Sequence, residues 1–118
     1  MKQIVRECIA EFFGTFILVL FGCSAGANTL LENTVGGGTA TNKAEFMSIT
    51  LGWAIGIYFG ILACINISGG HINPAVTLTM AVFERCPWAK VPFFLSSQLF
   101  GAFVGAVIVF LNNWDNLE

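Results

Sequence analysis

SGGHINPAVT, residues 68–77, is the stretch that decides the fold of this chain. It is a polar, glycine-containing turn that leads into a short apolar run, and it lies between two segments long enough to cross a bilayer. Backbone polar groups that face lipid find no water to bond, so non-helical backbone at membrane depth persists only where protein buries it or where it lines a cavity. The stretch therefore suggests a pore.

The composition indicates the class of protein. Of the 118 residues, 56% are hydrophobic and only 10% are charged, which is too apolar for an ordinary soluble domain. A net charge of -2 without a basic run argues against nucleic acid as a partner, and one histidine is too few for a histidine-built metal site. No paired nucleophile and base stands out, so we expect neither an enzyme nor a cofactor. The four cysteines lack C-x-x-C spacing and are interpreted as structural.

Three apolar segments pass the length test for a membrane crossing, which is about 20 residues. They are residues 8–31, with Glu11 as their only charge, and residues 46–66 and 91–111, which carry none. A fourth apolar piece, residues 74–83, has about half the length needed to cross. The sequence therefore predicts an all-α integral membrane protein with three transmembrane helices, and with one re-entrant loop and half-helix over residues 68–83.

The positive charges predict the orientation. Lys2 and Arg6 precede the first crossing, and Arg85 and Lys90 lie between the short helix and the third crossing, whereas only Lys43 falls on the other side. Since cytoplasmic loops carry an excess of Lys and Arg, the N-terminus is expected in the cytoplasm.

Small residues recur at every fourth position in each crossing, so that each set lines one helix face. Such a face lets two helix backbones approach closely. We therefore expect helix packing along three glycine ridges: Gly22 and Gly26; Gly52, Gly56 and Gly60; Gly101 and Gly105.

The short helix is predicted to begin at Asn73. Asn is a good N-cap, and Pro74 suits the first helical position because its fixed φ already fits. At about 1.5 Å per residue the helix reaches about 15 Å, which places its positive N-terminal end near the midplane of the membrane. Residues 68–72 are expected to run extended to that point, so their carbonyl oxygens form a ladder of acceptors. Acceptors that end in the Asn73 amide donors suit water and polyols rather than bare ions.

With its Asn-Pro-Ala box at Asn73, Pro74 and Ala75, the chain resembles the aquaporin, or major intrinsic protein, family. Residues 10–15 (AEFFGT) and the third crossing, with Gln98 and residues 101–103 (GAF), are also similar to that family. The resemblance covers nearly the whole chain. It implies the N-terminal half of the fold, a passive channel for small neutral solutes, and the lipid bilayer, here expected to be the plasma membrane, as surroundings.

The resemblance also implies residue roles. Asn73 is the donor near the midplane, and the backbone carbonyls come from Gly69, Gly70 and His71. Glu11 braces the re-entrant loop and Gln98 bonds its backbone. Trp53 is expected at the outer constriction, which is similar to the glycerol-conducting, or aquaglyceroporin, branch.

Several of these roles have alternatives. Trp53 could be a packing residue or could face lipid, Glu11 could snorkel to the interface, and Asn73 could be a plain N-cap at an interface. The His71 ring could simply be held by a neighbour while only its backbone matters.

A second Asn-Pro-Ala box and a second half-helix are missing from these 118 residues. We therefore expect the chain to need a second channel half, or full-length channel subunits, and to form a homo-tetramer when completed. The expected permeants are glycerol and water. The alternatives are a truncated, non-conducting protein that associates with full-length channels through its glycine ridges, and half of a strict water channel.

Overall fold

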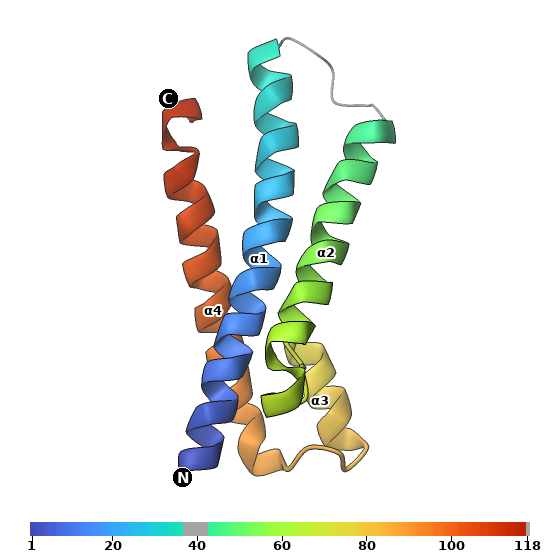
Figure 1. The fold of residues 1–118 in the computed structure, drawn as a ribbon, viewed down its shortest axis with the longest axis vertical. Helices are drawn as coiled ribbons and strands as arrows, with labels where there is room; N and C mark the ends of the chain where they lie inside the picture. Colours follow the sequence, from blue (N-terminus) through green and yellow to red (C-terminus); the bar gives the residue numbers. More distant parts are fainter. Residues whose placement is uncertain (37–42, 118) are drawn as a thin grey trace.

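The computed structural model describes residues 1–36 and 43–117, with side chains for 1–31 and 45–117. All regular elements in this part of the chain are helices (Figure 1). The elements, in chain order, are α1 (Lys2–Gly36), α2 (Lys43–Ser68), α3 (Pro74–Val82), the short 3-10 helix η1 (Trp88–Lys90), α4 (Val91–Asn112) and the 3-10 helix η2 (Trp114–Asn116).

Three of these helices are long and apolar enough to cross a membrane. The spans are Lys2–Leu31, Glu45–Ser68 and Trp88–Asn112. α1 stands between α2 and α4 and packs against both. The predicted class, three crossings with one short helix between the second and third, is confirmed. The helices α1 and α2 are longer than predicted at both ends, because their polar first and last turns continue the helix beyond the apolar run.

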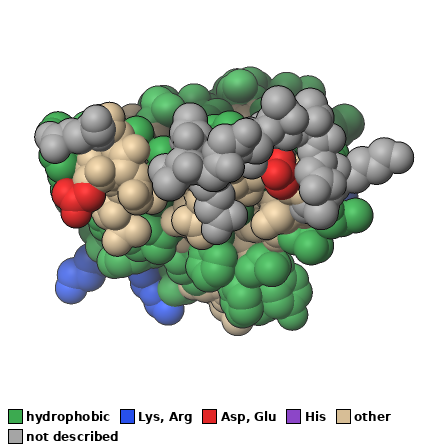
Figure 2. Space-filling view, turned by 90° about the horizontal axis from the view of Figure 1, so that it is seen from above, with side chains coloured by type: hydrophobic (Ala, Val, Ile, Leu, Met, Phe, Trp, Pro, Cys, Tyr) green, Lys and Arg blue, Asp and Glu red, His purple; other side chains and the backbone are tan. Residues whose placement is uncertain are grey.

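Burial is inverted relative to a soluble protein. Large apolar side chains such as Phe46, Phe103 and Leu99 are exposed, whereas Glu11, Thr77 and Gln98 are almost completely buried. Hydrophobic side chains accordingly cover much of the outline of the molecule (Figure 2). An apolar exterior around a polar interior is the arrangement that a lipid environment requires.

Glycines bring α1 into close contact with its neighbours. A Cβ added at Gly60 would lie 2.6 Å from the Gly14 carbonyl oxygen, and one added at Gly56 would lie 2.8 Å from the Leu18 oxygen. On the other side, Gly101 packs on the backbone of Phe12. The predicted ridges on α2 and α4 thus pack inside this chain.

On α1 the prediction needs a correction. A Cβ at Gly26 would meet no described atom within 4 Å, so Gly26 packs against none of the side chains of residues 1–31 and 45–117. Gly14, which the ridge prediction left out, provides the close approach instead. The helices α1 and α2 are therefore closest near the end that holds residues 68–77.

α3 has well-formed ends. Asn73 is its N-cap, with its side chain accepting from the Ala75 N–H at 2.8 Å, and Pro74 opens the helix. At the other end, the Arg85 N–H donates to the Met80 carbonyl at 2.8 Å, and Glu84 adopts a φ of +57°. This is the Schellman type of helix end, with Glu84 in the position that glycine usually takes.

The link between α2 and α3 differs from the prediction. Residues 69–72 do not run extended, because Gly69, Gly70 and Ile72 have φ values of +94°, +70° and +44°. The chain turns instead of climbing straight. Glycine adopts such angles without steric cost, whereas Ile72 must be held there by its surroundings.

α3 lies at the end of the molecule that also holds the N-terminus and the connection to α4 (Figure 1). The C-terminal ends of α1 and α4 and the start of α2 lie at the opposite end. With nine residues, α3 is about 14 Å long and too short to cross. The chain thus enters from one end and returns to it.

Candidate functional site

The candidate site is a buried cluster of polar side chains, here called the Glu11 hub. It joins all four α-helices where the link between α2 and α3 folds back against α1. Its members are Glu11, Ser68, His71, Thr77 and Gln98.

Glu11 is the centre of the hub and is 0% exposed. Its Oε1 accepts from Ser68 Oγ at 2.5 Å and from the His71 N–H at 3.0 Å. Its Oε2 accepts from the Ile72 N–H at 2.7 Å and from Gln98 Nε2 at 2.8 Å. Four donors thus match the roughly four acceptor positions of a carboxylate. The alternative that Glu11 snorkels to the interface is wrong, because its carboxylate is fully enclosed.

Thr77, from the second turn of α3, is the other junction of the hub. Gln98 Nε2 donates to Thr77 Oγ1 at 2.9 Å and to Glu11 Oε2, so both amide hydrogens of Gln98 are used. The prediction that Gln98 bonds the backbone of the loop is wrong, because both of its donors go to side chains. The Thr77 hydroxyl lies 3.3 Å from the Asn73 carbonyl oxygen, to which it donates, and 3.1 Å from His71 Nδ1. The His71 ring also packs edge-on against Phe94, with centroids 5.3 Å apart. The His71 ring is therefore held by neighbours on α3 and α4.

The bonds to Glu11 fix the direction of the neighbouring carbonyls. In a trans peptide unit the N–H and the preceding C=O point in opposite directions, and the described residues contain no cis peptide bond. Because the His71 and Ile72 N–H groups point at Glu11, the Gly70 and His71 carbonyls point away from it. The Gly70 N–H points at Ser68 Oγ, so the Gly69 carbonyl points away from that hydroxyl.

These three carbonyl oxygens accept no hydrogen bond from any described residue. The acceptors on Gly69, Gly70 and His71 are thus available to a molecule outside the hub. The sequence predicted the same three carbonyls, although it predicted an extended rather than a turning backbone.

Asn73 lies at the edge of the hub and is exposed. Its Oδ1 caps α3 through Ala75, while its Nδ2 has no partner among residues 1–36 and 43–117. Pro74 supplies no N–H, and the Ala75 and Thr77 N–H groups bond Asn73. The donors left at this helix end are the Asn73 Nδ2 group and the Val76 N–H, at the positive end of the helix dipole. Donors at Asn73 therefore follow the acceptors of residues 69–71 along the chain.

Trp53 does not touch the hub. Its ring lies over Gly22 of α1, where a Cβ would collide with it, and 38% of the residue is exposed. Gly22 is 11 residues beyond Glu11, which corresponds to about 16 Å along α1. Trp53 thus packs between two helices with one part and leaves the rest accessible to a solute or to another segment.

Sequence reasoning missed an ion pair that supports the hub from the N-terminal side. Lys90 Nζ lies 2.8 Å from Glu7 Oε2 and 3.1 Å from Glu7 Oε1, and Gln3 Nε2 donates to the same Oε1 at 3.1 Å. The pair fastens η1 to the first turns of α1. Ser68 and Thr77 were also missed as hub members, because their partners lie on other helices.

The described residues contain no group of three or more His, Cys, Asp or Glu side chains that could hold a metal ion. The hub is built from amide, hydroxyl, imidazole and carboxylate groups that are bonded to one another. The hub can therefore hold the backbone of residues 71 and 72 in a fixed position.

Comparisons with known proteins agree with this arrangement. The aquaglyceroporin from Plasmodium falciparum has a similar structure, with a TM-score of 0.83 and 33% identity over 97% of this chain and 44% of that one. Aquaglyceroporin-2 from Rhizophagus irregularis is 44% identical over 91% of this chain and 32% of its own length. Aquaporin-6 from Laccaria bicolor is 43% identical over 95% of this chain and 36% of its own length.

The chain thus spans about a third of the length of these curated relatives. The family model described as "Major intrinsic protein" matches residues 1–116, which is nearly the whole chain. The three long apolar helices and the returning short helix agree with that match. This chain is an integral membrane protein and belongs to the major intrinsic protein family.

Proposed function

We propose that this chain forms one half of the wall of a passive channel for glycerol, water and other small neutral solutes. The channel carries out no chemical reaction. The observation that carries the proposal is the Glu11 carboxylate, which takes up the amide hydrogens of residues 71 and 72 and thereby turns the carbonyls of residues 70 and 71 outward. Rigidly held backbone acceptors are the element that a selective solute path needs.

The order of groups along the path favours neutral molecules. Glycerol and water both donate and accept hydrogen bonds, so they can move from the carbonyls of residues 69–71 to the Asn73 amide. The positive end of α3 disfavours cations at that point. The Asn73, Pro74 and Ala75 box therefore serves as the donor end of the path.

Trp53 is proposed as one wall of the outer constriction. A broad apolar ring can contact the carbon backbone of a polyol while its hydroxyl groups bond elsewhere. The names of the relatives from Rhizophagus irregularis and Plasmodium falciparum, both aquaglyceroporins, support a glycerol path over a strict water channel.

We propose that a second half completes the wall, which the exposed position of Asn73 at the N-terminal end of α3 supports. We propose a completed channel that forms homo-tetramers in the plasma membrane, with the N-terminus in the cytoplasm. The basic residues Lys2, Arg6, Arg85 and Lys90 lie toward one end of the molecule, and Lys43 begins α2 at the other, which supports this orientation.

The alternative of a non-conducting protein that docks on full-length relatives through its glycine ridges has lost its main support. Gly56, Gly60 and Gly101 are occupied within the chain, so these ridges are not free for another subunit. Among the predicted ridge positions, Gly26 is the one without a neighbour in the described part of the chain.

Stopped-flow light scattering on proteoliposomes tests the proposal. The sample is a channel completed with a second half, and the measured quantities are its glycerol and water permeabilities. Trp53→Phe should change the ratio of the two permeabilities more than it lowers glycerol flux, whereas the matched variant Trp114→Phe in η2 should change neither. An unaltered ratio in Trp53→Phe would remove Trp53 from the constriction.

A further inference from the structure

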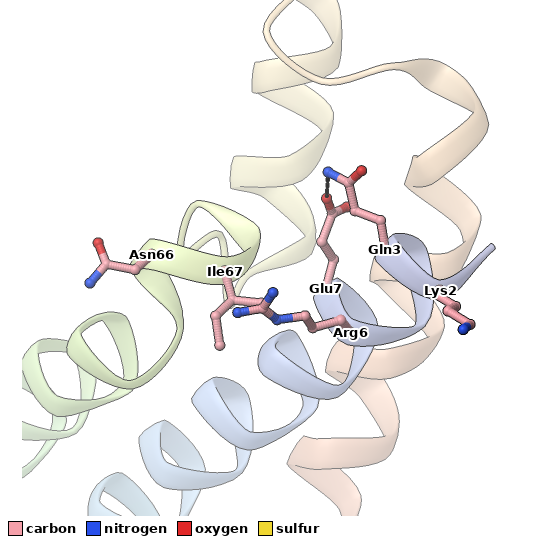
Figure 3. Close-up of a pocket in the computed structure, with 6 residues that line it drawn as sticks. All are labelled: Lys2, Gln3, Arg6, Glu7, Asn66 and Ile67. Atoms are coloured by element: carbon pink, nitrogen blue, oxygen red, sulfur yellow. Dashed lines mark hydrogen bonds between the residues drawn. The ribbon is translucent and has the colours of Figure 1, made fainter.

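Two adjoining hollows lie between the first turns of α1 and the last turns of α2. The polar hollow has a volume of about 460 Å³ and is lined by polar and charged groups, including Lys2, Arg6 and Asn66 (Figure 3). The apolar hollow, about 410 Å³, shares Lys2, Arg6 and Ile67 with the polar one and continues along apolar side chains. We call the two together the N-terminal trough.

The polar hollow carries uncompensated positive charge. Lys2 and Arg6 have no carboxylate within 4.0 Å among the described residues. The nearby Glu7 carboxylate is already bonded to Lys90 and Gln3. In Figure 3 the Arg6 side chain extends from α1 toward Ile67 on α2, while the Lys2 side chain extends the other way.

The apolar hollow is bounded by a strip of apolar surface that faces outward. Val5, Ile9 and Phe13 follow one another on α1 at spacings of four residues, and each is about half exposed. Ala63 on α2 is small and leaves the space between the helices open. The strip starts at the charged end of the membrane span and runs along it.

We infer that the N-terminal trough binds one anionic phospholipid. Its phosphate is bound in the polar hollow that Lys2, Arg6 and Asn66 line, and one acyl chain lies along the apolar strip. Basic pockets between transmembrane helices select anionic headgroups, and a buried chain adds affinity in proportion to its apolar contact. The inference does not depend on whether the channel conducts.

A second groove, between α1 and α4, borders the other side of the apolar strip. It is larger, about 1010 Å³, and shares Val5, Ile9 and Phe13 with the trough. In the described part of the chain it is lined by no lysine, arginine, aspartate or glutamate side chain, and Met1 brings only the terminal amino group. Lipid there should depend less on headgroup charge than lipid in the trough.

Native mass spectrometry of the detergent-purified chain, titrated with dioleoyl phosphatidylserine or dioleoyl phosphatidylcholine, tests the inference. We expect one phosphatidylserine to bind at least tenfold more tightly than phosphatidylcholine. Loss of both cations in the Lys2→Gln, Arg6→Gln variant should weaken phosphatidylserine binding about 30-fold. The control Arg85→Gln, a cation outside the trough, should leave binding unchanged. Equal affinity for the two lipids, or an equal loss in the control, overturns the inference.

A second pair of variants tests the acyl strip without a change of charge. Ala63→Phe should fill the strip and weaken phosphatidylserine binding at least tenfold, while Ala106→Phe on the exposed side of α4 should not. Inorganic phosphate at millimolar concentration should fail to displace the lipid. Displacement by phosphate alone would mean a simple anion site, and a dimer of this chain that Ala63→Phe abolishes would mean a protein contact. Either result contradicts the lipid site.

Discussion

Replacing Glu11 by glutamine is the sharpest perturbation of the hub, because it keeps the shape of the side chain and removes one acceptor oxygen. Glu11 accepts four hydrogen bonds, at 2.5, 3.0, 2.7 and 2.8 Å. A glutamine keeps one carbonyl oxygen, so two of the four donors then face an NH₂ group. Two bonds to a charged acceptor at about 1.5–3 kcal/mol each amount to about 3–6 kcal/mol. We expect a loss near 3 kcal/mol, since the link between α2 and α3 can shift to relieve part of the mismatch.

The stability of the variant can be measured by unfolding in mixed micelles with increasing dodecyl sulfate. The loosened link also has a local reporter. Cys64 is 1% exposed and packs in a buried cluster with Ile72, so it should become reactive to a maleimide once residues 69–72 move. The other three cysteines are replaced by serine for this measurement.

Glu84→Gln is the matched control, because Glu84 is an exposed acid near the end of α3. It should change neither the free energy of unfolding nor the labelling of Cys64. Our reasoning about the hub is refuted if Glu11→Gln lies within about 0.5 kcal/mol of the unsubstituted chain and Cys64 stays protected.

Three further predictions concern packing, charge and thiol chemistry. Gly60→Ala should destabilise the chain by about 1–3 kcal/mol, because its Cβ would meet the backbone of α1 at 2.6 Å, whereas Gly26→Ala should be neutral or slightly stabilising in the same unfolding assay. Lys90→Glu should lower the free energy of unfolding by about 2 kcal/mol, which is less than for a fully buried pair because the Lys90 side chain is 32% exposed. Adding Glu7→Lys should restore part of that loss, and no recovery would show that the ion pair is unimportant. Burial raises the pKa of the Cys86 thiol, so its alkylation rate should rise only at a pH above the ordinary thiol value of about 8.5, and an inflection at or below that value would contradict the buried placement.

The helices were predictable because their signals are local. Long apolar runs identify the three crossings, and Asn73 followed by Pro74 gives the start of α3 without reference to the rest of the chain. The resemblance to the aquaporin family pointed to Glu11 and Gln98, whereas the sequence alone says only that polar side chains inside apolar spans need partners. The structure brings these two together with a 2.8 Å hydrogen bond.

Other features depend on contacts between distant parts of the sequence. Glu7 and Lys90 are 83 positions apart, and nothing near either residue indicates the other. Regular spacing places Gly22 and Gly26 on one helix face, but it does not say how far along that face the neighbouring helix stays in contact. Ile72 has a positive φ where its N–H donates to the Glu11 carboxylate. That hydrogen bond joins distant parts of the sequence and exists only in the folded chain.

Glycerol flux through a completed channel with and without the Asn73 amide tests the central proposal most directly. Under a glycerol gradient, proteoliposomes that contain the channel with Asn73 should swell faster than liposomes without protein. Asn73→Asp replaces the amide donors by a negative charge and should lower that flux at least tenfold, whereas Asn116→Asp in η2 should not. A completed channel with no glycerol flux above the lipid background, or an undiminished flux in Asn73→Asp, would contradict the account.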